Sequence, residues 1–119
     1  MIDIKGTIGT ALTTDATLTA LLGSGERVFY ITPPVNKVCP CIIYSEEDNK
    51  PVYCGDNEEI ASEIIVYVNV FTAGDTFPIA SRTNDLMVGL GFVREYARDL
   101  PKNNGMYQKH MRFQTMKEV

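Results

Sequence analysis

The chain has 119 residues and a net charge of −4, with 45% apolar and 22% charged residues. This length suits a single domain over residues 1–119 with a core of its own, and the apolar content excludes a disordered chain. A net acidic chain is poorly suited to nonspecific nucleic-acid binding, which requires clustered positive charge. The apolar run at 63–72 is about half as long as a membrane helix, and the residues after Met1 lack a secretion signal pattern. We therefore expect a protein that stays in the cytoplasm where it is made and has no membrane partner.

The beginning of the chain carries two helix patterns. Apolar residues recur at helical spacing over residues 2–13, although Gly6 and Gly9 each weaken a helix by about 1 kcal/mol relative to alanine. Tertiary packing must compensate for these two glycines. A second, shorter helix is predicted over residues 15–22, between the N-cap residue Asp15 and a glycine stop.

Strand patterns follow. Residues 27–31 predict a short strand that is ended by Pro33 and Pro34, and another strand begins at residues 41–44. Residues 63–72 are almost continuously β-branched, aromatic or apolar. Such density is typical of a central strand that is covered by other elements.

The last third of the chain predicts a helix and a hairpin. Turn and N-cap residues followed by Pro78 favour a helix over residues 77–90. Its core positions at helical spacing are predicted to be Ile79, Thr83, Leu86, Met87 and Leu90. Strands are predicted at 92–98 and 106–116, joined through an Asn-Gly turn. The fold class is therefore α+β, with a four- to five-stranded, mostly antiparallel sheet on which two to three helices pack.

A polar stretch over residues 45–59 connects two predicted strands and is longer than a tight hairpin needs. It contains Pro51 and Gly55 and has few apolar anchors, although Val52 and Tyr53 suit a small extra strand. Long connections in compact domains are often mobile or functional. We therefore predict that residues 46–58 form a mobile, protruding arm.

Charge is distributed unevenly. Residues 46–63 hold seven acids and one base, whereas residues 94–119 hold six bases and three acids. Solvated loops and sheet faces explain many such segments. Two patches of opposite sign would also suit contacts between copies of one chain. The residues assigned to this hypothetical interface are Glu46, Glu47, Asp48, Glu58, Glu59, Glu63, Arg94, Lys109 and Arg112.

Catalytic and metal-binding patterns are not evident. Cys39, Cys41 and Cys54 are best interpreted as free thiols of a reducing compartment; even with His110, their spacing suits a structural zinc site poorly. A Cys54 nucleophile with His110 as base would also need an orienting group that no pattern suggests. The sequence lacks a phosphate loop, a dinucleotide-binding glycine motif, H-E-x-x-H and G-x-S-x-G. We predict no catalytic residue, no metal and no cofactor.

The order and spacing of several packing and turn motifs resemble the small tail-completion proteins of long-tailed bacteriophages and prophages, including siphophage tail terminators. An amphipathic N-terminal helix opens this resemblance, and a central strand, a helix ending near Gly91-Phe92 and a closing strand continue it over nearly the whole chain. The motifs that carry it are Asp15, Leu18, Leu21-Leu22-Gly23, Arg27-Val28-Phe29-Tyr30, Pro33-Pro34, Pro40-Cys41-Ile42-Ile43-Tyr44 and Tyr107-Gln108-Lys109-His110-Met111-Arg112-Phe113.

The resemblance implies a structural function in virion assembly. Proteins of this family form a ring, usually a hexamer, that caps the completed tail tube and joins it to the neck proteins of the filled head. DNA passes through the ring without specific binding, and an acidic wall suits such a conduit because it repels DNA. The expected partners are further copies of the chain, the tail-tube protein and the head-neck connector proteins. The expected location is the host cytoplasm during assembly and then the tail-head junction of the virion.

Two other classes remain open at this stage. Another head-tail adaptor, such as a neck or stopper protein, would share the cytoplasmic origin and the ring. A small cytoplasmic enzyme that uses Cys54 or His110 would instead have a deep pocket with a perturbed titrating group.

Overall fold

The computed structural model describes residues 1–32 and 39–119. The helices are α1 (Lys5–Thr14), α2 (Ala16–Leu22) and α3 (Phe77–Gly89), and the strands are β1 (Val28–Tyr30), β2 (Cys41–Tyr53), β3 (Glu59–Thr72), β4 (Val93–Asn103) and β5 (Met106–Glu118). The strands form one sheet in the order β1-β2-β3-β5-β4. Among the described strands, only the β1–β2 pair is parallel. The predicted α+β class is thus confirmed, including the mostly antiparallel sheet of five strands and the helices on it.

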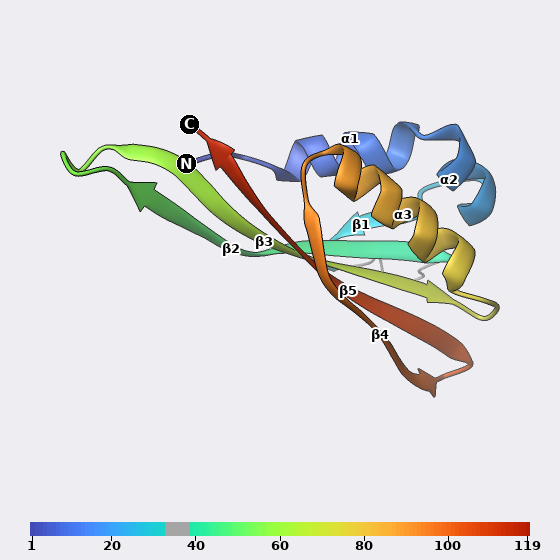
Figure 1. Cartoon of the computed structure of the whole chain (residues 1–119). Coiled ribbons are helices and arrows are strands. Elements are labelled where there is room, and N and C mark those ends of the chain that lie inside the picture. Colours follow the sequence, from blue (N-terminus) through green and yellow to red (C-terminus); the bar gives the residue numbers. More distant parts are fainter. Residues whose placement is uncertain (33–38) are drawn as a thin grey trace.

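All three helices lie on one face of the sheet, which we call the helix face (Figure 1). The predicted central strand is β3, with β2 and β5 on its two sides. Along β3, Ile64, Val66, Val68 and Val70 are fully buried, whereas the residues between them are partly exposed. Because successive side chains of a strand point to opposite faces, this alternation places the core between the sheet and the helices. The opposite face of the sheet is called the open face below.

A close approach between α1 and β2 explains one of the two glycines in the first helix. The Tyr44 hydroxyl of β2 donates a hydrogen bond of 3.1 Å to the Lys5 carbonyl. A Cβ atom added at Gly9 would lie 2.7 Å from that hydroxyl, whereas one added at Gly6 would meet nothing within 4 Å. Gly9 therefore makes room for the tyrosine.

The predicted starts of α2 and α3 are confirmed, whereas the first helix begins at Lys5 and not at residue 2. The Asp15 side chain caps α2 by accepting a hydrogen bond of 2.9 Å from the Leu18 N–H. Before α3, the N-cap residue Thr76 makes no side-chain cap bond, and Asp75 Oδ1 instead accepts from the Phe77 N–H at 3.0 Å. The α3 residues that are buried or partly buried against the core are Ile79, Ala80, Thr83, Leu86, Met87 and, just after the helix, Leu90.

The prediction of a polar connection over residues 45–59 is wrong. Strand β2 continues to Tyr53 and β3 begins at Glu59, so that a tight turn joins one long hairpin. The N-terminal segment braces this hairpin: Asn49 Nδ2 donates to the Ile2 carbonyl at 2.8 Å, and the Ile2 N–H donates to Ser62 Oγ at 3.2 Å. Paired backbones satisfy their hydrogen bonds whatever the polarity of the exposed side chains, which is why composition misled the prediction. Figure 1 shows that this hairpin does protrude beyond the helices.

The C-terminal hairpin is confirmed but is longer than predicted, because β4 runs to Asn103 and β5 to Glu118. Its turn residues Asn104 and Gly105 both have positive φ angles, 52° and 77°, as a tight hairpin turn requires. Strand β1 ends at Tyr30. The two prolines that were predicted to end it, Pro33 and Pro34, lie outside the described residues.

The described molecule is elongated, with extents of 53 × 28 × 26 Å. The turn of the β2–β3 hairpin lies at one end of the long axis, and the β4–β5 turn with the start of α3 lies toward the other (Figure 1). None of the described helices is both long and apolar enough to cross a membrane.

Candidate functional site

The tip of the long hairpin and the end of β5 beside it expose apolar side chains together with acids. We call this surface the hairpin end. Tyr53 is 59% exposed, Met116 60% and Val119 65%, and exposed apolar residues that gather in one region are more informative than scattered ones. The hairpin end comprises Val52, Tyr53, Asp56, Glu58, Glu59, Ile60, Met116, Glu118 and Val119.

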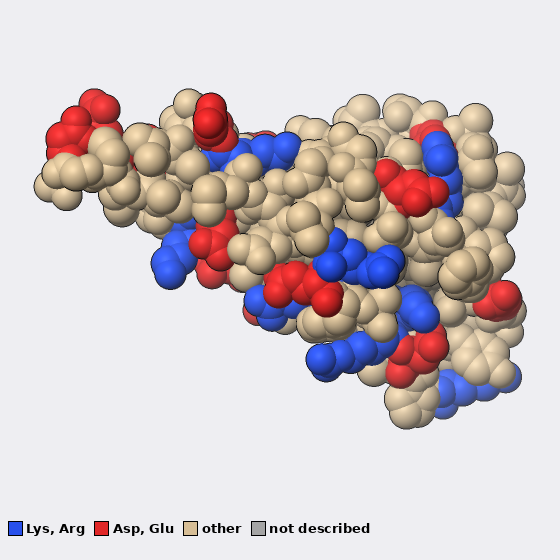
Figure 2. All heavy atoms as spheres, viewed as in Figure 1, with Lys and Arg blue, Asp and Glu red and all other residues tan. Residues whose placement is uncertain are grey.

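Acids dominate the charge of the hairpin end, and they gather at the left-hand tip of the molecule in Figure 2. The ammonium group of Met1 lies 2.9 Å from Glu59 Oε1 and lowers the pKa of that carboxyl. Asp56 accepts a hydrogen bond from the Cys54 thiol, which lowers the pKa of Asp56. Among the described residues, Glu58 has no ion-pair partner. The tip is therefore negatively charged over the ordinary pH range.

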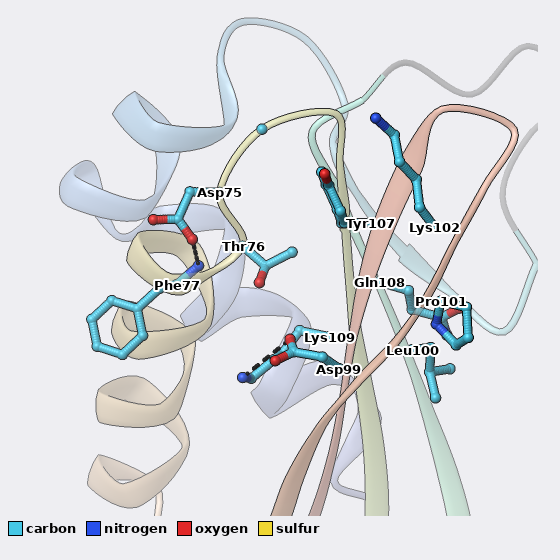
Figure 3. A pocket seen from close by; sticks show the side chains of 11 residues that line it. Asp75, Thr76, Phe77, Asp99, Leu100, Pro101, Lys102, Tyr107, Gln108 and Lys109 are labelled. Carbon is cyan, nitrogen blue, oxygen red and sulfur yellow. Dashed lines mark hydrogen bonds and ion pairs between the residues drawn. The ribbon is translucent and has the colours of Figure 1, made fainter.

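A cleft of about 750 Å³ lies at the opposite end, between the start of α3 and the β4–β5 hairpin (Figure 3). Tyr107 lines it and is 44% exposed, and the Lys102 ammonium lies 4.8 Å from the centre of the Tyr107 ring. Lys109 Nζ lies 3.3 Å from Asp99 Oδ1. Phe77 stands on the rim, 64% exposed, with its ring directed away from the cleft. We call the cleft with its rim the cleft end. It comprises Gly74, Asp75, Thr76, Phe77, Asp99, Leu100, Pro101, Lys102, Tyr107, Gln108 and Lys109.

The open face of the sheet carries a network that connects three strands. Asn69 Oδ1 of β3 lies 2.7 Å from His110 Nδ1 of β5, and His110 Nε2 lies 3.3 Å from the Tyr96 hydroxyl of β4. Tyr67 packs edge-on against the same imidazole at 4.8 Å. Burial lowers the pKa of His110, and the nearby positive charge of Arg98 lowers it further. The imidazole is therefore a neutral hydrogen-bonding group at pH 7 that joins the strands.

The structure does not bring the predicted interface bases together. Arg94 donates to Asn84 Oδ1 of α3 at 3.1 Å, and Lys109 lies in the cleft, so both are on the helix face. Arg112 lies on the open face, where it donates to Glu95 Oε1 at 3.1 Å, and this carboxylate raises the pKa of Arg112.

The predicted interface acids are also spread over several places. Glu46 and Asp48 flank a β-bulge in the middle of β2, and Glu47 is the extra residue of that bulge. Glu58 and Glu59 belong to the hairpin end, and Glu63 accepts a hydrogen bond of 2.9 Å from Gln114 Nε2 across the β3–β5 pair.

The thiols and His110 do not form one site. Cys39 Sγ and Cys41 Sγ lie 3.6 Å apart near the start of β2, whereas Cys54 is at the hairpin turn. Among the described residues, no group of three histidine, cysteine, aspartate or glutamate side chains is placed to hold a metal ion. The cleft is lined by neither Cys54 nor His110, the two residues that the enzyme alternative would use.

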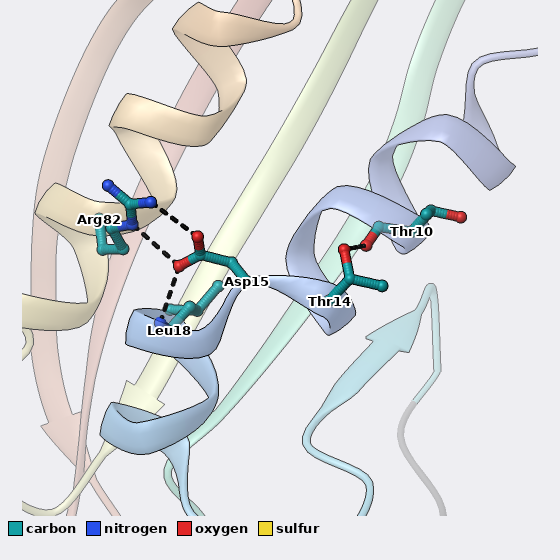
Figure 4. A network of polar contacts seen from close by, with 5 residues as sticks. All are labelled: Thr10, Thr14, Asp15, Leu18 and Arg82. Atoms are coloured by element: carbon teal, nitrogen blue, oxygen red, sulfur yellow. Dashed lines mark hydrogen bonds and ion pairs between the residues drawn. The ribbon is translucent and has the colours of Figure 1, made fainter.

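A polar link between α2 and α3 was missed at the level of sequence. Arg82 Nε and Nη2 lie 2.9 and 2.6 Å from the two carboxylate oxygens of Asp15, the residue that also caps α2 (Figure 4). The cap itself was recognisable from the sequence. Its arginine partner was not, because it lies 67 residues further along the chain.

Comparison with known proteins gives a likeness of fold. No family model matches the chain, and no curated protein matches it. Among solved structures, a chain described as "Virion of native gene transfer agent (GTA) particle" matches with a TM-score of 0.70 and 20% sequence identity. The match covers 94% of this chain and 92% of that chain. The two chains therefore share one fold over nearly their full lengths.

Proposed function

We propose that this protein is a structural component of a phage-like virion. The observation that carries the proposal is the shared fold with a chain of a gene transfer agent particle, which extends over nearly all of both chains. The sequence motifs listed above, which resemble tail-completion proteins, support the same class independently. An assembly part needs surfaces rather than a reactive centre, and the exposed apolar side chains at two ends of the molecule supply such surfaces.

Within that class, we propose the role of a tail terminator. The chain would form a ring, in our proposal a hexamer, on the head-proximal end of the tail tube. The ring would stop tube polymerisation and present a surface to the head-neck connector proteins, and DNA would pass through its lumen. The net charge of −4 supports passage without adhesion of DNA. The protein would act in the host cytoplasm during assembly and remain at the tail-head junction.

The runner-up function is a neck or stopper protein that contacts the head instead of the tube. The same fold likeness supports it, because the comparison concerns a whole virion and not a named position in it. The enzyme hypothesis is weaker, since the pKa of His110 is lowered in a cross-strand network rather than in the cleft.

Deleting the gene from the phage or particle-producing element that encodes it tests the proposal. A terminator predicts filled heads without tails, together with free tubes of uncontrolled length, and addition of purified protein should restore joining. Tubes of normal length with leaking heads would favour the neck or stopper role. Intact, joined particles in the deletion strain would overturn both roles.

A further inference from the structure

We infer that copies of this chain join head to tail, with the hairpin end of one subunit seated in the cleft end of the next. This inference rests on the proposed ring and deepens it by naming the two surfaces and their occupant, a second copy of the chain. A ring with one contact per neighbour requires two different complementary surfaces on each subunit. The hairpin end and the cleft end lie toward opposite ends of the long axis, as that arrangement requires (Figure 1).

The chemistry of the two ends is complementary. The hairpin end offers Tyr53 and Ile60, 59% and 47% exposed, beside the carboxylate of Glu58, which forms no ion pair with any described residue. The cleft offers the exposed ring of Tyr107, with the Lys102 ammonium over it. Lys102 has no carboxylate partner among the described residues, because Asp99 is paired with Lys109. Seating the tip would therefore bury aromatic and aliphatic surface and bring the Glu58 carboxylate to the Lys102 ammonium.

The two acids of the cleft do not cancel this complementarity. Asp75 is engaged by the N–H of Phe77 at the start of α3, and Asp99 by the Lys109 ammonium. Each acid already has a partner within its own subunit. Lys102 is thus the cation of the cleft that remains available to an incoming carboxylate.

Pairing between sheet edges is the obvious rival, and features that oppose it occur in the outer half of β2, which β1 does not cover, and in the edge strand β4. The outer half of β2 carries Pro51, Lys50 and a bulge next to Asp48. The edge strand β4 carries Pro101 and two irregularities of register. Prolines, charges and bulges are the devices that prevent strands from adding to an edge. The end-to-end contact does not require a strand to be added to either edge.

A mixing experiment with two complementary variants tests the contact. Tyr53→Asp damages only the hairpin end, and Lys102→Glu with Tyr107→Asp damages only the cleft end. We expect each variant alone to be monomeric by analytical ultracentrifugation at concentrations where the wild-type chain forms closed oligomers. A one-to-one mixture should form a dimer and nothing larger, because only one intact pair of surfaces remains. Circular dichroism and melting curves identify any variant that is unfolded.

Two further variants make the outcome decisive even if one of these fails to fold. Glu58→Lys should weaken self-association at least tenfold, and adding Lys102→Glu should recover part of the loss. Val88→Asp, on the exposed side of α3, is the matched control and should leave association unchanged. Oligomers that persist in all variants, a mixture that stays monomeric, or a monomeric wild type would each overturn the inference. Oligomers that behave as expected but do not cap tail tubes would overturn the proposed terminator and leave the inference intact.

Discussion

Arg82 and Asp15 form a bidentate ion pair that links α2 to α3 on the helix face of the sheet. The two contacts are 2.9 and 2.6 Å long, and the Asp15 side chain is only 15% exposed. The same carboxylate caps α2 through the Leu18 N–H. One acidic side chain thus both caps the start of α2 and links this helix to α3.

This pair predicts a pH dependence of stability. The hydrogen bonds from Arg82 and then from Leu18 hold the pKa of Asp15 at about 2, below its ordinary value of 3.8. The folded chain therefore binds this proton less tightly than the unfolded chain does, so the contribution is complete above about pH 4 and is lost as the pH falls through 2. Arg82→Met should lower the free energy of unfolding at pH 7, and the difference from wild type should narrow between pH 4 and 2.

Chemical denaturation at a series of pH values measures this difference. Arg94→Met is the matched control, because Arg94 donates to the neutral side chain of Asn84 rather than to a carboxylate. A difference between wild type and Arg82→Met that stays constant from pH 7 to 2 would show that the carboxylate of Asp15 is not stabilised by this arginine.

The two glycines of α1 should respond in opposite ways to alanine. Gly6→Ala should stabilise the protein by about 0.5 kcal/mol, since the added methyl group meets nothing and the helix gains propensity. Gly9→Ala should destabilise it by about 1–3 kcal/mol, because the methyl group would lie 2.7 Å from the hydroxyl of the buried Tyr44. Adding Tyr44→Phe should recover part of the loss. Thermal unfolding measures all three, and equal effects of the two alanines would refute the packing described for Gly9.

The His110 imidazole predicts a second pH dependence of stability, at a higher pH than that of Asp15. Burial, followed by the charge of Arg98, lowers its pKa below 6.5. The unfolded chain therefore takes up the proton first, and the stability contributed by the neutral imidazole is present above about pH 6.5 and decreases as the pH falls further. Arg98→Gln should raise the pKa of His110, because it removes the nearby positive charge. Since the chain has one histidine, its imidazole proton signals in NMR give this titration directly; a midpoint at or above 6.5 in the wild type would contradict the expectation.

The three cysteines should be dispensable for assembly. Replacing all of them by serine should leave ring formation intact, and the loss of stability should follow burial. Cys41→Ser should cost about 1–3 kcal/mol because it places a hydroxyl in a fully buried position, whereas Cys54→Ser at the exposed turn should cost little. Stoichiometric zinc in the purified wild type, measured by plasma mass spectrometry, would overturn this expectation.

Local sequence patterns predicted those helices and strands whose apolar spacing and capping residues are clearest. Residues 63–72 and 77–90 have the period and caps of a central strand and a helix, and β3 and α3 form there. Most of the strand through residues 45–53 was missed because its side chains are polar, although its backbone pairs with β3 along most of this length. The support that Ile2 gives to Asn49 comes from 47 residues away, so no local window contains both partners.

The candidate interface was predicted less well for a similar reason. Alternation along β5 places Lys109 and Arg112 on opposite faces, and the structure agrees. The partners that already occupy these bases, such as Glu95 beside Arg112, depend on a bulge in β4 that shifts the register between Arg94 and Tyr96. Exposed apolar residues such as Tyr53 and Met116 look like ordinary core residues in a sequence. Their exposure depends on where the strands end and which parts of the sheet the helices cover, which local patterns do not show.

Electron microscopy of the purified protein mixed with growing tail tubes tests the proposed function most directly. The account predicts a ring at one end of each tube, tubes that stop lengthening once the ring is bound, and an open lumen along the tube axis. Tubes that continue to grow from both ends, with the protein free in solution or bound along their sides, would contradict it.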